Sequence, residues 1–183
     1  MAIEVRPSSI EGNGCFTTVP IKAGEVVERL EGEIIPTSQL AEIEASGLYH
    51  SSLAISETKS LLLAVFDPRQ AESSVAVGSG VGGFNHSCDS NLWMRDAVTV
   101  EARRDIEAGE ELTLDDALIS TEEWILENCR CGAVACRGTP TGRDWRLPEV
   151  QQRYAGHFSP FLNERIENLF PSPSTGRGPG GGV

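Results

Sequence analysis

The residues with the clearest chemistry in this sequence are four cysteines, of which one is isolated and three are closely spaced. Cys129, Cys131 and Cys136 lie in one short segment, and Cys88 lies well upstream of it. A structural zinc site is usually tetrahedral with four Cys or His ligands, so the three clustered cysteines need one further ligand. The sequence therefore predicts a zinc site that Cys88 completes, which ties the two segments together.

The cysteine trio has two alternatives to a metal site. A disulfide with one thiol left over, or unrelated surface cysteines, would also account for the three cysteines. Cys129 and Cys131 are too close in sequence to bridge each other comfortably, and Gly132 and Gly138 would ease the turns that a metal site needs. Zinc is therefore the preferred interpretation. The fifth cysteine, Cys15, occupies an apolar position and is expected to be a small buried hydrophobic residue.

Three further motifs accompany the cysteines. Gly12-Asn13-Gly14 precedes an Ile-Lys-Ala-Gly-Glu run at 21–25, Asn85-His86-Ser87 leads into Cys88, and Gly-Glu-Glu-Leu-Thr-Leu-Asp-Asp follows at 109–116. In this order they resemble the SET domain, the family of S-adenosylmethionine-dependent lysine methyltransferases. The cysteine trio resembles the post-SET zinc segment of that family.

The resemblance implies a mainly β fold made of small antiparallel sheets with pseudoknot-like threading, short helices and a helical C-terminal extension. We expect a SET domain at 3–120 with an insert region at 38–80, then a post-SET zinc segment at 121–140. A helical extension at 141–170 follows. The last part, 171–183, is rich in Gly, Pro and Ser and is expected to be disordered.

The resemblance also implies S-adenosylmethionine as cofactor alongside Zn²⁺. Gly12, Asn13 and Gly14 would contact its amino acid end, and Asn85 and His86 would bind its amino and adenine portions. Taken alone, the glycine motif could be an ordinary hairpin turn and His86 a core histidine. The polar neighbours of His86 and the nearby metal ligand favour a site. Zinc would close the post-SET loop over cofactor and substrate.

One position departs from the family pattern. The tyrosine that normally follows the Asp of the last motif, and that lines the lysine channel, is replaced here by Asp116. A carboxylate can pair with an amine, but it favours the protonated, non-nucleophilic form. Tyr49 or Tyr154 could supply a substitute phenol, and Asp116 and Tyr49 are the predicted catalytic residues. Gly83-Phe84 replaces the usual Phe-Ile pair, and the glycine could widen the channel.

Three functions are compatible with these features. The first is a methyltransferase acting on lysine in a basic protein or peptide. The second is a SET-type enzyme that uses the same cofactor on a small-molecule amine or other metabolite, which the lost tyrosine favours. The third is a catalytically impaired module that binds the cofactor or a peptide.

Composition restricts the partners. The 183 residues carry 27 acidic and 15 basic side chains, a formal net charge of −12, so direct binding to nucleic acid is not expected. No run approaches the roughly 18 apolar residues of a membrane span, and no secretory signal is recognised at 1–6. The clustered cysteines fit a reducing compartment, and the cytoplasm is expected. The acid-rich stretch at 101–127 could steer a cationic substrate, although a solvated surface is the more ordinary explanation.

The elements that would position these motifs are short. Alternating apolar runs predict strands at 3–5, 26–30, 33–36, 61–66, 92–94 and 98–102, and helices are expected at 38–47, 121–126, 148–154 and 159–170. Ser159 and Pro160 are typical of a helix start. The aromatic residues of the extension would form a cap on the core or a dimer contact, so a homodimer is an alternative arrangement. Trp124 is expected in the core.

Overall fold

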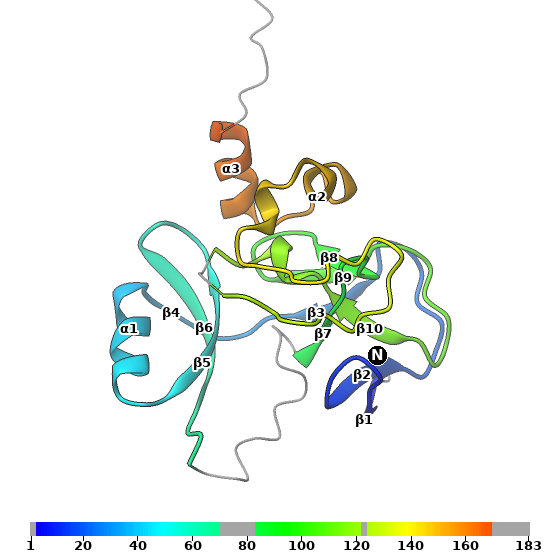
Figure 1. The fold of residues 1–183 in the computed structure, drawn as a ribbon, viewed down its shortest axis with the longest axis horizontal. Coiled ribbons are helices and arrows are strands. Elements are labelled where there is room, and N and C mark those ends of the chain that lie inside the picture. The colour runs from blue at the N-terminus through cyan, green and yellow to red at the C-terminus, as the bar shows by residue number, and fades with distance from the viewer. Residues whose placement is uncertain (1–2, 70–82, 122–123, 170–183) are drawn as a thin grey trace, which may run out of the picture.

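The strands of this chain form three small sheets, with few and short helices (Figure 1). The computed structural model describes residues 3–69, 83–121 and 124–169. The sheets have the strand orders β1-β2-β10-β7, β3-β9-β8 and β4-β6-β5. The mainly β fold predicted from the sequence is confirmed. The strands are β1 (Ile3–Pro7), β2 (Asn13–Thr17), β3 (Val26–Arg29), β4 (Glu33–Pro36), β5 (Tyr49–Ala54), β6 (Lys59–Phe66), β7 (Asn85–His86), β8 (Leu92–Met94), β9 (Thr99–Ala102) and β10 (Glu111–Leu114).

The first sheet places the three motifs side by side. Strand β10 lies between β2 and β7, antiparallel to the former and parallel to the latter. Glu111 is therefore opposite Phe16 in β2, while Thr113 is opposite Asn85 in β7. The glycine turn at the start of β2 and the Asn-His pair thus flank one strand, although they are distant in sequence.

The pattern Ile-x-Ala-Gly-Glu occurs at 21–25 and again at 106–110, and the two runs face each other. Ile21 and Ile106 form an antiparallel bridge with N–H to O distances of 2.9 Å in both directions. Gly24 and Gly109 adopt φ values of 80° and 88°, which suit glycine, and each turn leads into a strand. The similarity of the two runs therefore has a structural basis as a pair of mutually bonded turns.

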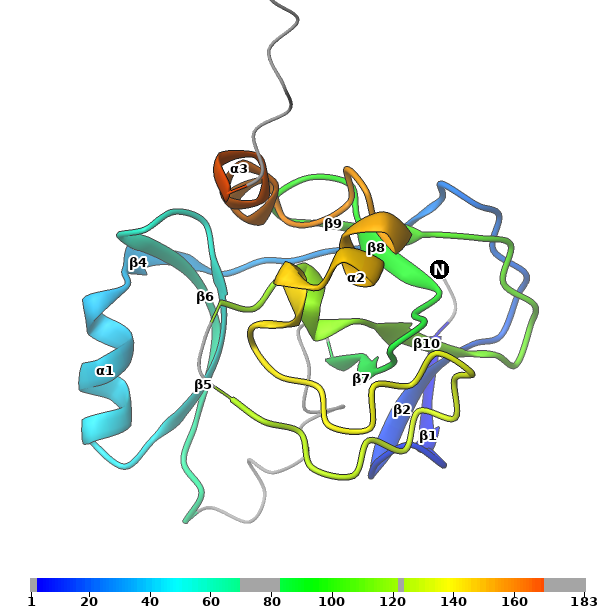
Figure 2. The same ribbon diagram turned by 45° about the horizontal axis from the view of Figure 1, so that its top comes forward.

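The insert forms the third sheet and one helix, α1 (Ser38–Ala45). Figures 1 and 2 both show α1 on the outer side of this sheet, away from β7. Leu40 of α1 and Ile35 of β4 are buried, and Gly47, with a φ of 75°, ends the helical turn. The helix expected at 38–47 is confirmed, whereas β5, which pairs along most of its length with β6, was not predicted.

The C-terminal extension packs on the core as a cap. It contains the short 3₁₀ helix η4 (Asp144–Arg146), α2 (Pro148–Arg153) and α3 (Pro160–Leu169). Helices α2 and α3 lie above β8 in Figure 1, and α2 lies in front of β8 in Figure 2. Ser159 caps α3 by accepting a hydrogen bond from Leu162 N at 3.4 Å, as its residue type predicted. The buried side chains of the extension that join the main core cluster are Trp145, Val150, Tyr154, Phe158 and Leu162.

Some expectations were wrong or lie outside the described residues. No helix forms over the described part of 121–126: Ile125 bridges Thr141, and Leu126 N donates to Pro140 O at 2.8 Å, which requires extended backbone. Trp124 is half-buried rather than part of the core cluster, and it donates to Ser120. Residues 171–183, where disorder is expected, lie outside the described residues. Most of the glycine-rich stretch before Gly83 lies outside them as well. None of the described helices is both long and apolar enough to cross a membrane.

Candidate cofactor and metal site

A small hollow of about 70 Å³ opens where the post-SET segment crosses the first sheet. Ile10, Glu11 and His86 line one wall, and residues 126–130 line the other. Ligand pockets are generally about 300–1,000 Å³, so this hollow has room for only part of a cofactor. Its position is nevertheless informative, because it joins the loop before the glycine motif, the Asn-His strand and the start of the cysteine trio.

Asn85 holds the glycine turn against β7. Its side-chain amide lies 2.7 Å from Glu111 Oε1, 3.1 Å from Glu11 O and 3.2 Å from Asn13 O. A Cβ on Gly14 would lie 2.1 Å from Glu111 Oε1 and 3.2 Å from Asn85 Nδ2, so a side chain at position 14 would displace the Glu111 carboxylate. Glycine at this position therefore lets Glu111 reach Asn85. Of the predicted cofactor residues, Asn85 and Asn13 form one hydrogen-bonded unit with Glu11 and Glu111.

Glu111 is the central residue of this unit that the sequence analysis missed. Its second carboxylate oxygen accepts a 2.8 Å hydrogen bond from Ser8 Oγ, while the first faces Asn85. The available signal was its place in the Gly-Glu-Glu motif at the start of a strand. One carboxylate thus connects three segments: the loop after β1, β7 and β10.

His86 is buried and sits between the metal cluster and Asp116. Its Nε2 lies 3.4 Å from Cys88 Sγ, and its Nδ1 lies 3.2 Å from Asp116 Oδ2. Burial lowers the pKa of His86, but its contacts with Asp116, Cys88 and Asp115 outweigh this and raise it to about 10. The structure thus brings two predicted site residues, His86 and Asp116, into direct contact.

The neighbouring carboxylates Asp115 and Asp116 have different environments. Asp115 is fully buried; it caps the 3₁₀ helix η3 (Asp116–Leu118) through Ala117 N and accepts two 2.7 Å hydrogen bonds from Arg137. Burial lowers the pKa of Arg137, but Asp115 raises it more strongly, so the guanidinium remains charged. The Asp116 side chain is 26% exposed. Asp115 therefore has a structural role, whereas Asp116 is accessible to a ligand.

The two tyrosines considered as substitutes are placed differently. Tyr49 lies on β5 in the insert sheet, opposite Phe66, and its side chain is exposed. The described contacts do not join it to Asp116 or His86, so a catalytic role for Tyr49 stays a prediction. Tyr154 is fully buried, and burial raises its pKa to about 12. Its hydroxyl bonds to the backbone near Cys88, and the described contacts do not join it to Asp116, so Tyr154 as a substitute phenol also stays a prediction.

The four predicted zinc ligands come together. The sulfur atoms of Cys88, Cys129, Cys131 and Cys136 all lie within 4.8 Å of one another. Zn–S bonds of about 2.3 Å in a tetrahedron place sulfurs about 3.8 Å apart, so small movements would complete the geometry. Cys88 Sγ accepts a hydrogen bond from Arg137 N at 3.3 Å, and Cys136 Sγ accepts one from Gly138 N at 3.4 Å. Such N–H donors stabilise thiolates.

The cysteine pKa values also distinguish the ligands. Burial raises the pKa of Cys131, but backbone hydrogen bonds from Cys88 and Ala133 outweigh this and lower it to about 7. Burial raises the pKa of Cys129 to about 11. All five cysteines are free thiols, and Cys15 is buried, as expected. The donor set therefore fits zinc and does not fit the disulfide alternative.

Comparisons with known proteins agree with this geometry. The SET domain family profile matches residues 12–115, from the glycine motif to Asp115. The chain is 30% identical over 138 residues to a histone-lysine N-methyltransferase TRX1 of Oryza sativa subsp. japonica, with 72% of this chain and 13% of that protein covered. It is also 30% identical over 159 residues to a histone-lysine N-methyltransferase SUV39H2 of Gallus gallus, with 73% of this chain and 38% of that protein covered.

The chain belongs to the SET domain family, because the family match covers more than half of its residues. The resemblance inferred from the four motifs is confirmed, and the cysteine cluster fits the zinc segment expected after the domain. This chain spans only 13% and 38% of the two relatives named above. What those longer proteins act on is therefore not transferred directly.

Proposed function

We propose that this protein is an S-adenosylmethionine-dependent N-methyltransferase that acts on lysine in a basic protein or peptide. The supporting observation is the single hollow shared by the Asn85-His86 strand, the loop before the glycine motif and the post-SET segment. The similar proteins are called histone-lysine N-methyltransferases, which supports a protein substrate. The net charge of −12 favours a cationic partner.

The cofactor would supply an electrophilic methyl group, and the residues of this chain would bind and orient the two reactants. Asn85 would keep the glycine turn in place, and His86 with residues 126–130 would enclose the adenosyl part. Transfer requires an aligned, uncharged amine close to the methyl carbon. Asp116 lies at the position of the family tyrosine, and its carboxylate would attract the incoming cationic amine.

The acid-rich stretch at 101–127 gives little extra support to a cationic substrate. Several of its carboxylates are already paired within the protein: Glu101 with Arg95, Asp105 with Lys22, and Glu110 with Arg104. The ordinary interpretation of this charge run, a solvated and internally paired surface, is therefore the better one. Glu11 and Glu127, which line the hollow, are closer to the proposed reactants.

A small-molecule amine is the second candidate substrate class. The observation that favours it is the contact between Asp116 and His86, which puts a histidine-bound carboxylate where the family has a phenol. A compact cation could be held there without a peptide. A binding module that carries out no transfer is the third candidate, and it would also retain Asn85 and the metal cluster.

Labelled cofactor separates these candidates. The purified full chain would be incubated with radiolabelled S-adenosylmethionine and, in parallel, with a pool of basic peptides and with an extract of small metabolites. Label in peptide lysine supports the proposal, label in a small molecule supports the second candidate, and label in neither contradicts enzymatic function. Cofactor binding measured by calorimetry then shows whether the binding module remains.

Variants identify the role of the unusual carboxylate. Asp116→Tyr restores the family residue, and Glu164→Gln on the exposed part of α3 serves as a control for the loss of one negative charge. Higher lysine methylation by Asp116→Tyr would mark Asp116 as a damaging replacement. Loss of a native activity in the same variant would show that Asp116 has its own function in that reaction.

The metal and the compartment complete the proposal. We propose Zn²⁺ at Cys88, Cys129, Cys131 and Cys136, where it would fix the post-SET segment beside the hollow. Bound metal measured by mass spectrometry of the native protein tests this directly, with one zinc per chain expected. The free thiols are consistent with a reducing compartment such as the cytoplasm, which fluorescence microscopy of a tagged chain would test.

A further inference from the structure

The loop that carries Cys88 is held from behind by the C-terminal extension. The Cys88 carbonyl accepts a hydrogen bond from Arg153 NH1 at 2.5 Å and lies 3.4 Å from the Tyr154 hydroxyl. That hydroxyl in turn accepts a hydrogen bond from Ser90 N at 3.1 Å. Tyr154 is fully buried, so these bonds form where water does not compete.

The cysteine trio is connected to the same extension through Arg137. This residue lies directly after Cys136, and its backbone N–H bonds to Cys88 Sγ. Its side chain is 10% exposed, its guanidinium lies between Asp115 and Asp144, and its Nε is 2.5 Å from Asp144 Oδ2. Asp144 is fixed at its other oxygen by Thr141 Oγ1 at 2.7 Å.

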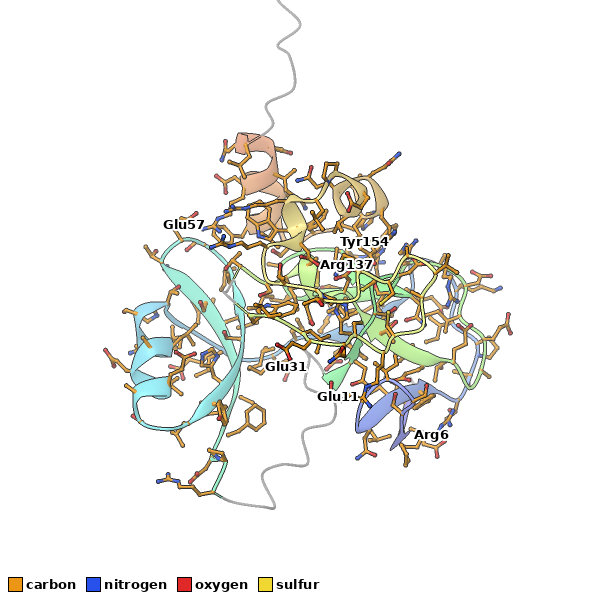
Figure 3. All side chains as sticks on the ribbon, viewed as in Figure 1. Arg6, Glu11, Glu31, Glu57, Arg137 and Tyr154 are labelled. Carbon is orange, nitrogen blue, oxygen red and sulfur yellow. The ribbon has the colours of Figure 1, made fainter. Side chains whose placement is uncertain are left out.

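The two sets of contacts converge on one place in the molecule. Figure 3 labels Arg137 and Tyr154, which lie where the extension meets the strands of the core. Asp115 acts on both residues. It pairs with Arg137, and after burial its charge is the second cause that raises the pKa of Tyr154. The extension therefore reaches both segments that supply metal ligands, through buried polar groups in each case.

We propose that Tyr154, Arg153 and Arg137 are positioning residues of the metal centre, so that metal binding and docking of residues 141–159 form one cooperative unit. The inference rests on the proposed zinc site but not on methyl transfer. A buried polar group that loses its hydrogen-bond partner costs free energy, so the metal and the docked extension should be lost together. Release of the metal would free the Cys88 loop and remove the acceptors that Tyr154 and Arg153 use.

An extension that only covered the apolar core would behave differently. Trp145, Val150 and Phe158 belong to the core cluster, which includes none of the four clustered cysteines. If these apolar contacts alone held the extension, it would stay docked after the metal was removed. The two arrangements therefore predict opposite results for the same treatment.

Hydrogen exchange of the full chain tests the coupling. Backbone exchange would be measured by mass spectrometry with zinc bound and after removal of zinc by a chelator under reducing conditions. We expect protection to fall in 144–158 together with 124–141, while β5 and β6 of the insert keep theirs. Unchanged protection over 144–158 after complete metal removal overturns the proposal.

A pair of tyrosine variants gives a second test. Removal of the buried hydroxyl in Tyr154→Phe should release zinc to a chromogenic chelator about tenfold faster, in line with the loss of one buried hydrogen bond. Tyr49→Phe removes an exposed hydroxyl in the insert and is the matched control, with an unchanged release rate expected. Equal rates for the two variants contradict the positioning role.

The outcomes also separate this inference from the proposed function. A purified protein without zinc overturns both the metal site and the coupling, whatever its activity. A zinc protein whose extension stays docked after chelation retains the proposed site and loses only the coupling. If Tyr154→Phe does not fold, the exchange experiment on the unaltered chain still decides the question.

Discussion

The metal side of the molecule and the insert are held together by different kinds of contact. On the metal side, segments from 85–88, 115–116, 129–137 and 144–154 meet through buried charges, thiols and hydrogen bonds between residues far apart in sequence. In the insert, β5 and β6 pair as neighbours in the chain and α1 packs beside them. The insert can therefore form from local contacts, whereas the metal side requires several distant segments at once and, in our proposal, an ion.

Loss of one metal ligand should produce the largest difference in stability between the metal side and the insert. Cys88→Ser removes the buried ligand that joins the cysteine trio to the first sheet, and structural zinc contributes about 10–16 kcal/mol of apparent binding free energy in small zinc domains. We expect loss of bound zinc, measured by metal analysis, and early unfolding of the metal side, measured by circular dichroism. Cys15→Ser, which changes a cysteine outside the cluster, is the control, and an equal loss of zinc in it would contradict the assigned ligands.

The second largest difference should come from the buried ion pair. Arg137→Met leaves Asp115 buried without its partner, and breaking such a pair costs about 3–5 kcal/mol. The counterpart near the insert is Arg165→Met, which removes the exposed pair with Glu57 and should change the melting temperature only slightly. Urea unfolding of both variants measures the contrast. Equal effects would show that the buried network does not stabilise the fold.

Two glycines distinguish steric from conformational requirements. Gly14→Ala on β2 places a Cβ 2.1 Å from Glu111 Oε1, so we expect a loss of about 2 kcal/mol of stability and weaker cofactor binding. Gly47→Ala in the insert meets open space, but its φ of 75° disfavours alanine by about 1 kcal/mol. Thermal unfolding with and without S-adenosylmethionine compares them. If Gly47→Ala also weakened the stabilisation by S-adenosylmethionine, a cofactor site that depends on position 14 would be contradicted.

The smallest expected effect is a pH dependence outside both regions. Burial raises the pKa of Glu28 on β3 above its ordinary value of 4.5. The folded state then binds this proton more tightly than the unfolded state, so the stability contribution of Glu28 falls as pH rises through the interval above 4.5. Glu28→Gln should remove this decline, measured as the difference in unfolding free energy from the unaltered chain. A difference independent of pH would contradict it.

The cysteine cluster and the family could be predicted because they depend on residue types in a fixed order. Cysteines that chelate one ion and a glycine that precedes a strand leave a pattern in the sequence, and the structure brings Cys88 to Cys129, Cys131 and Cys136 as expected. The short strands with clear apolar runs, such as β6 and β9, were also predicted. Their continuous apolar runs indicate buried strands, and all four residues of β9 are buried.

The features that were missed depend on partners far away in the chain. Strand β7 is only two residues long and exists because β10 pairs with it. Residues 124–126 have helix-forming side chains, but hydrogen bonding to 140–142 keeps them extended. Likewise, nothing near Tyr154 in the sequence indicates that its hydroxyl serves the Cys88 loop. Such contacts arise from topology, which periodicity does not encode.

The hydrogen-bonded turns at Ile21 and Ile106 make the geometry of the core independent of the length of the insert. Since these turns tie together the chain segments on either side of the insert, residues between β4 and β6 could be lengthened or shortened without moving the glycine motif or Glu111. The first sheet and the residues that line the hollow thus keep their geometry when that region varies.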